Sequence, residues 1–107
     1  MEREIVFSGE VEIYLKNLID ILFDNNYFGF KEDARNYVQE IVKFVMSNDF
    51  KLNVRKTPRT FQKFGKKFIV YKANTRTSWY IFFDQKGDQF LINHILNNHS
   101  HEFPELM

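Results

Sequence analysis

The stretch KFIVYKANTRTSWYIFFDQKGDQFLINHIL, residues 67–96, contains three runs of apolar residues separated by two short polar segments. Val, Ile, Tyr, Phe and Trp favour strands, whereas Asn, Gly and Asp favour the turns between strands. The three runs are therefore predicted to form strands at Lys67–Ala73, Thr77–Asp84 and Gln89–Leu96. Because both connections have hairpin length, consecutive strands are expected to pair as an antiparallel meander.

Two helices are predicted before the meander. From Glu10 to the Asn25-Asn26 pair, apolar residues recur every three or four positions, and Ser8 or Gly9 can cap the start. The same periodicity predicts a second helix from about Lys31 to Met46. The link between the two helices is short, so they are expected to form an antiparallel hairpin.

The remaining segments complete the expected fold. Residues 4–7, Glu-Ile-Val-Phe, have the composition of a short strand, and residues 50–65 are predicted to be a loop or a short edge strand. The tail, Asn97–Met107, is polar and shows no periodicity. The predicted order is β-α-α-β-β-β, an α+β fold with a helical hairpin packed on one face of a small, mostly antiparallel sheet.

Length and composition narrow the possible functions. The 107 residues, 44% of them hydrophobic, suffice for one domain, residues 1–107, with one core, and this excludes a two-domain enzyme. Because the chain has no cysteine, disulfides, a thiolate nucleophile and cysteine-based metal sites are excluded. No apolar run approaches the ~20 residues of a membrane helix, so we expect a cytoplasmic protein without a membrane partner.

The net charge of +1 conceals a strong separation of charge along the chain. Residues 1–49 carry five basic and ten acidic side chains, residues 50–83 nine basic and no acidic ones, and residues 84–107 one basic and four acidic ones. A block with a net charge of +9 attracts polyanions such as RNA. Two other interpretations remain open, namely that these cations pair with the acidic helices or protect a sheet edge from aggregation.

Histidine is the main candidate for chemistry, because the sequence has no dinucleotide, phosphate-loop, zinc-protease or serine-hydrolase motif. His94, His99 and His101 lie within eight residues of one another and can exchange protons near neutral pH. His94 alternates with Phe90 and Ile92, which favours a hydrogen-bonded or partly buried histidine of the core. His99 and His101 lack a convincing third metal ligand, so neither a metal site nor another cofactor is expected.

Cations beside a histidine can cleave RNA without a metal ion, because RNA supplies its own 2′-hydroxyl nucleophile. We expect His99, His101, Arg76 and Lys72 to act on the reacting phosphate. RNA contacts are expected from Lys63, Lys66, Lys67, Tyr71 and Tyr80, the two tyrosines by stacking on bases. Trp79 lies in an apolar strand and is interpreted mainly as a core residue.

Three segments resemble the RelE/ParE superfamily of bacterial toxins from toxin-antitoxin pairs: YFGFKEDARNYVQEIVKFV at 27–45, KFIVYKANTRTSWYIFFD at 67–84 and NNH at 97–99. The resemblance implies a ribosome-dependent endoribonuclease that cuts translated mRNA and is held inactive by a cognate antitoxin. It places the phosphate contacts on Lys66, Lys67, Lys72 and Arg76, and the proton-transfer position on His99, with His101 as a second candidate.

The sequence departs from the family pattern near its end. RelE-like proteins usually carry an arginine near the end of the last strand and often a tyrosine in the tail, where this chain has Asn97-Asn98-His99 and Phe103. Two alternatives therefore stay open. One is a non-catalytic toxin of the same fold that inhibits DNA gyrase, as ParE-like proteins do, and the other is a nucleic-acid-binding module without toxicity.

Overall fold

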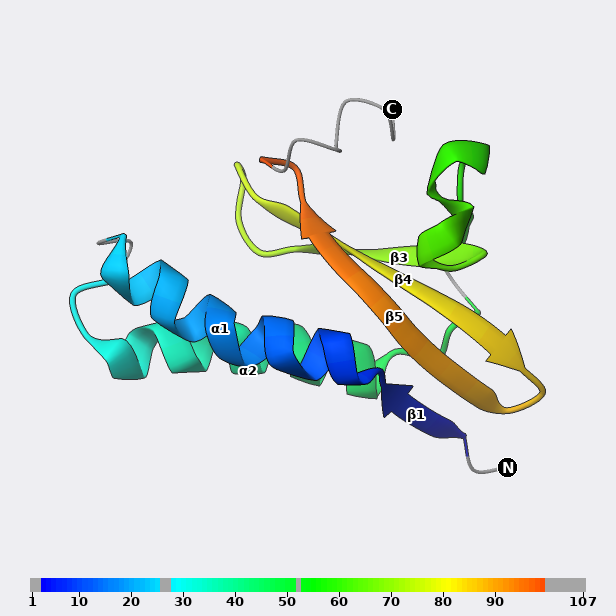
Figure 1. Ribbon diagram of the computed structural model, residues 1–107, viewed down its shortest axis with the longest axis horizontal. Coiled ribbons are helices and arrows are strands. Elements are labelled where there is room, and N and C mark those ends of the chain that lie inside the picture. The colour runs from blue at the N-terminus through cyan, green and yellow to red at the C-terminus, as the bar shows by residue number, and fades with distance from the viewer. Residues whose placement is uncertain (1–2, 26–27, 52, 100–107) are drawn as a thin grey trace.

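The computed structural model describes residues 3–25, 28–51 and 53–99 (Figure 1). The elements, in chain order, are β1 (Glu4–Phe7), α1 (Gly9–Asp24), α2 (Lys31–Ser47), β2 (Arg55–Lys56), the 3₁₀ helix η1 (Arg59–Phe64), β3 (Lys67–Lys72), β4 (Ser78–Lys86) and β5 (Gln89–Asn97). The predicted helices and the three main strands are all present, with ends that differ from the predicted ones by one or two residues.

The five strands form one mixed sheet in the order β1-β5-β4-β3-β2. β3, β4 and β5 make the predicted antiparallel meander, and β1 pairs with β5 in parallel. In the segment 50–65, Arg55 and Lys56 pair with β3 as a short edge strand before the chain enters η1. The structure therefore confirms the α+β fold class and adds η1, which the sequence pattern did not predict.

The two helices of the hairpin pack on the sheet through the apolar residues that recur every three or four positions along them. At the start of α1, the Ser8 hydroxyl oxygen accepts a hydrogen bond from the Val11 backbone N–H at 3.2 Å, which satisfies one free donor of the first turn. α1 buries Val11, Leu15 and Leu18, and α2 buries Ala34, Val38, Ile41 and Val45. Neither helix, among the residues the structure describes, is long and apolar enough to cross a membrane.

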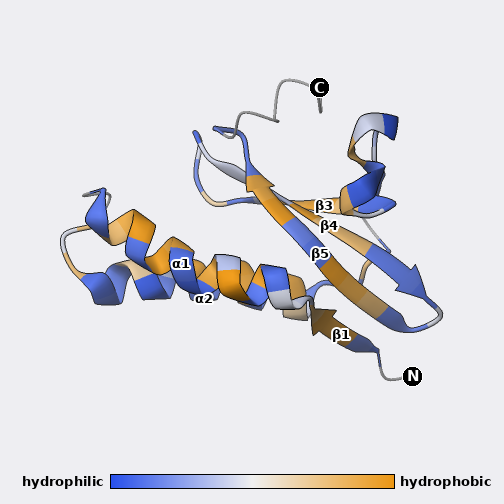
Figure 2. Cartoon of the chain, in the orientation of Figure 1, coloured by the Kyte–Doolittle hydropathy of each residue, from blue (hydrophilic) through white to orange (hydrophobic). Residues whose placement is uncertain are grey.

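The sheet has an apolar core on each of its two faces. On the helix face, the side on which α1 and α2 pack, Ile69, Trp79, Ile81, Phe83 and Ile92 are buried. On the opposite side, which we call the η1 face, Phe61 of η1 packs with Phe68, Phe82 and Leu96. Figure 2 shows apolar residues along much of the strands, hydrophilic residues at strand ends and a hydrophilic stretch in the middle of β5. Polar side chains of the sheet are therefore concentrated at the strand ends and at this stretch of β5.

A β-bulge in β5 moves His94 to the face opposite the one its alternation predicts. Phe82 pairs with His94 but Phe83 pairs with Ile92, so Asn93 is an extra residue in β5. Phe90 and Ile92 consequently lie on the helix face, whereas His94 stacks on Phe64 on the η1 face, with ring centroids 3.8 Å apart. His94 is half-buried, as the sequence analysis favoured.

Gly65 lets the chain turn from η1 into β3 directly over the backbone of β4. Its φ is +148°, and a Cβ atom there would lie 2.8 Å from the backbone nitrogen of Phe83 and 2.9 Å from its carbonyl oxygen. Backbone atoms of a central strand cannot move aside without breaking their pairing. A residue without a side chain is therefore required at this position.

We predict that Gly65→Ala lowers the free energy of unfolding by about 2 kcal/mol or more, because it combines backbone strain with a steric clash. Chemical denaturation monitored by circular dichroism measures this loss. Gly9→Ala is the matched control, since a Cβ at Gly9 meets nothing within 4 Å. Equal stability of the two variants would show that residue 65 does not lie against the Phe83 backbone as described.

Candidate functional site

The cations of β3 lie at opposite ends of the strand. Lys67 and Lys72 begin and end β3, which in an extended strand separates them by roughly 17 Å. Side chains alternate along a strand, so Lys67 belongs with Ile69 on the helix face and Lys72 with Val70 on the η1 face. Two of the four cations to which the resemblance assigns phosphate contacts, Lys67 and Lys72, therefore lie on opposite faces of the sheet.

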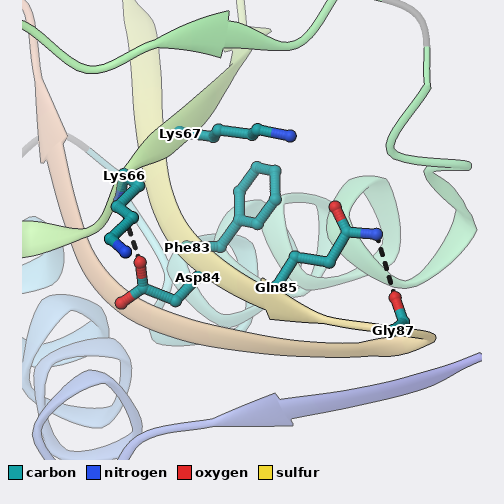
Figure 3. A pocket seen from close by; sticks show the side chains of 6 residues that line it. All are labelled: Lys66, Lys67, Phe83, Asp84, Gln85 and Gly87. Atoms are coloured by element: carbon teal, nitrogen blue, oxygen red, sulfur yellow. Dashed lines mark hydrogen bonds between the residues drawn. The ribbon is translucent and has the colours of Figure 1, made fainter.

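At the start of β3, Lys66 and Lys67 border a hollow of about 400 Å³ beside Phe83, Asp84 and Gln85 (Figure 3). The carboxylate of Asp84 accepts hydrogen bonds from the Lys66 backbone N–H at 3.0 Å and from the Asn93 amide at 2.8 Å. These bonds hold the Asp84 carboxylate next to Lys66. This carboxylate reduces the attraction of this end for a phosphate.

None of the nine cations in residues 50–83 takes part in the ion pairs of the described part of the chain. Those pairs are Lys31–Asp20, Arg35–Glu32 and Lys43–Glu40, all within the helical hairpin. The acidic helices therefore do not neutralise the basic block, contrary to one of the alternatives considered from the sequence.

The second end of the sheet brings together the β3–β4 hairpin and the end of β5. Lys72 pairs with Ser78 across the hairpin. The Asn98 side chain accepts a hydrogen bond from the Ser78 backbone N–H at 3.1 Å and donates one to the Arg76 carbonyl oxygen at 2.9 Å. One amide thus ties the segment after β5 to the turn that carries Arg76.

Side-chain hydrogen bonds also fix the turn itself and the position of His99. The side-chain oxygen Oδ1 of Asn74 accepts hydrogen bonds from the backbone N–H groups of Arg76 and Thr77, at 2.8 and 2.9 Å. The His99 backbone N–H donates to the Asn97 side chain at 2.8 Å, and its ring Nε2 lies 3.4 Å from the Thr77 hydroxyl oxygen. His99 and Arg76 are both exposed.

We call this end of the sheet the His99 site and define it by Lys72, Asn74, Arg76, Thr77, Asn98 and His99. Lys72, Arg76 and His99 were expected from the sequence to act together, and the structure places them at the same end. His101, the fourth residue of that expected set, lies outside the described residues. Sequence reasoning missed Asn74, Thr77 and Asn98, because polar turn residues leave no periodic signal.

The residues expected to contact RNA do not share one surface. Tyr80 belongs to the η1 face, where Lys63 of η1 also lies, with its ammonium nitrogen 5.1 Å from the centre of the Phe64 ring. Tyr71 lies on the helix face and packs on Phe44 with ring centroids 4.9 Å apart. The two tyrosines therefore cannot stack on neighbouring bases of one strand.

The pKa of Tyr71 is raised above its ordinary value of 10.0, chiefly because burial disfavours the phenolate, with the charges of Glu40 and Tyr37 adding to the effect. The phenol therefore stays protonated at physiological pH. It acts as a hydrophobic residue between α2 and β3.

A cleft opens next to His99 on the helix face, with a volume of about 710 Å³. It lies between the free end of the helical hairpin and the end of the sheet. Trp79 lines its floor, is 1% exposed, and donates a hydrogen bond from Nε1 to the Tyr37 hydroxyl at 2.9 Å. Trp79 is therefore a core residue, as the sequence indicated, although its ring borders an accessible space.

The His99 site holds two cations and one group that can exchange a proton at the same end of the sheet, with His99 beside the helix-face cleft and Lys72 on the η1 face. Lys72 and Arg76 can neutralise a phosphate, and the His99 imidazole can accept or donate a proton. Among the residues the structure describes, no three histidine, aspartate or glutamate side chains come together as ligands for a metal ion. The site thus has the parts for anion binding and proton transfer.

Comparison with known proteins identifies no relative. No protein-family model matches the chain, and no match was found among curated proteins or among solved structures.

We predict that Asn98→Ala lowers the free energy of unfolding by about 1–3 kcal/mol, because it removes two hydrogen bonds that cross the end of the sheet. Faster amide hydrogen exchange at Ser78 would locate the loss at the hairpin. Asn17→Ala on the exposed side of α1 is the matched control, and its stability should not fall. Unchanged exchange at Ser78 in the Asn98 variant would contradict the described bonding.

Proposed function

We propose that the protein is a RelE/ParE-like toxin that cleaves mRNA on the ribosome without a metal ion. The observation that carries this proposal is the His99 site, where an exposed imidazole lies at the same end of the sheet as Lys72 and Arg76. The resemblance of the sequence to that superfamily and the α+β architecture support the proposal. An antitoxin that covers the cations would hold the protein inactive in the cytoplasm.

The reaction divides into tasks that these residues can perform. His99 removes the proton from the RNA 2′-hydroxyl, and the resulting oxyanion attacks the adjacent phosphorus. Lys72 and Arg76 stabilise the negative charge that accumulates on the phosphorane. The bond from phosphorus to the 5′-oxygen then breaks, and the products are a 2′,3′-cyclic phosphate and a 5′-hydroxyl. The leaving oxygen needs a proton, for which His101 is the candidate by its place in the sequence.

Electrostatics supports RNA as the substrate. The nine cations of residues 50–83 are free of ion pairs within the described chain, so binding RNA does not require them to leave protein carboxylates. Each phosphate they neutralise releases condensed counterions, which favours binding at low salt. The cations at the two ends of β3 would contact different phosphates of an extended RNA strand.

We predict that the purified protein cuts mRNA on translating ribosomes and that His99→Ala and Arg76→Ala each reduce the cleavage rate at least about 100-fold. Primer extension on the recovered message measures the cuts. Arg35→Ala is the matched control, because Arg35 is an exposed arginine on α2 whose partner is Glu32. This control should cleave at the wild-type rate.

Three results would contradict the proposal. Correctly folded wild-type protein that never cuts RNA would exclude the nuclease, and inhibition of gyrase supercoiling with RNA left intact would select the non-catalytic toxin. Salt-dependent RNA binding without cleavage or growth arrest would select a binding module.

A further inference from the structure

The cleft beside His99 has one apolar wall and one polar wall. The free end of the helical hairpin supplies the apolar wall, which includes Ile21, Leu22 and Phe28. The opposite wall comes from the end of the sheet and includes Asn74, Thr77 and His99. In Figure 1 the hairpin and the upper end of the sheet diverge from the region where α1 meets β5. The cleft therefore lies on the helix face, at the end of the sheet where the turn that carries Arg76 lies, whereas Lys72 is on the η1 face.

The apolar wall can hold a flat ring. Phe28 packs against Tyr37 with ring centroids 5.3 Å apart, and Tyr37 packs edge-on against Trp79 at 6.2 Å. Ile21 is 48% exposed, although it faces a space lined by other apolar side chains. Burying such a surface against an aromatic ligand is favourable.

The polar wall can bind the edge of that ring and an attached anion. The Thr77 hydroxyl and the His99 ring nitrogen lie 3.4 Å apart and offer both a donor and an acceptor. Arg76 is an exposed residue of the turn between Asn74 and Thr77, which both line the cleft, so its side chain starts at this wall. The helical side is unsuited to an anion, because residues 1–49 carry five basic and ten acidic side chains.

We propose that this cleft binds a single unstacked nucleobase of the RNA and presents the attached phosphate to Arg76. A ligand with a flat apolar body, a hydrogen-bonding edge and one anionic group matches the three features of the cleft, and a nucleotide has this chemistry. The volume of about 710 Å³ lies within the ordinary range for a small-molecule site. The inference rests on the proposed function for its substrate class, RNA, and it adds where the base lies.

The geometry gives the bound base a role in the reaction. A base held between Ile21 and the polar wall keeps its ribose close to His99. The 2′-hydroxyl of that nucleotide is then the one that His99 deprotonates. Base binding would therefore position the reacting phosphodiester, and the cleft would determine which nucleotide is cut.

Trp79 offers a direct measurement of binding, because it is the single tryptophan of the chain and lines the cleft. We expect a saturable change of Trp79 fluorescence when the full chain is titrated with AMP or UMP. Ribose 5-phosphate is the control for the phosphate and sugar, and it should cause no such change. No cleavage is needed for this measurement.

Two matched substitutions test the location. Ile21→Glu replaces part of the apolar wall by a carboxylate and should weaken nucleotide binding about tenfold or more. Ile13→Glu, on the same helix at an exposed position outside the cleft, should bind like wild type. Thr77→Val removes one polar group without changing the size of the side chain and should weaken binding severalfold. This variant provides the test if the Ile21→Glu protein is poorly folded.

The outcomes separate this inference from the proposed nuclease. Base-dependent fluorescence that Ile21→Glu weakens supports the cleft, even if the protein never cuts RNA. Cleavage by a protein whose Trp79 does not respond to AMP or UMP overturns the cleft and leaves the nuclease standing. A response to a polypeptide partner, with none to nucleotides, would make the cleft a protein-binding site and overturn the inference.

Discussion

The arrangement of the whole chain depends on β4, a central strand with apolar side chains on both faces. Trp79, Ile81 and Phe83 face the helices and Phe82 faces η1, and all four are nearly inaccessible to water. A strand of this kind is stable only when both sides of the sheet are covered. The helical hairpin covers one side, and η1, held close by Gly65, covers part of the other. The charged side chains of β3 and β4 therefore lie near the strand ends, and the polar residues within β5, Asn93 and His94, lie at its bulge.

The candidate chemistry lies at one such end of the sheet, where the β3–β4 turn meets the segment after β5. The Asn98 amide links the Ser78 backbone N–H to the Arg76 carbonyl oxygen, and these groups are 20 and 22 residues from Asn98 in the sequence. The Asn98 side chain thus holds the segment that carries His99 against the turn that carries Arg76. Such a junction can position a proton-transfer group beside cations without burying any charge, and this is the physical basis of the proposed ribonuclease.

The two ends of β3 differ in a way that bears on function. At the Lys66 end, the Asp84 carboxylate accepts two hydrogen bonds and places a negative charge among the cations. At the His99 site, the side chains that form hydrogen bonds among the described residues are those of asparagine, threonine and histidine, and no carboxylate is among them. A phosphate therefore meets less electrostatic opposition at the second end, where the apolar cleft also opens.

Much of the fold follows from local patterns in the sequence. The three- and four-residue spacing of Leu15 and Leu18, the Ser8 cap and the alternating runs of residues 67–96 fix the helices and the meander, because these signals act between near neighbours. Composition likewise fixes the basic block. Only the tertiary structure decided that β1 pairs with β5, that the bulge at Asn93 turns His94 to the η1 face, that Lys67 and Lys72 lie on opposite sides, and that a cleft lies beside Trp79. These features depend on strand register and on contacts between distant segments, which no local periodicity specifies.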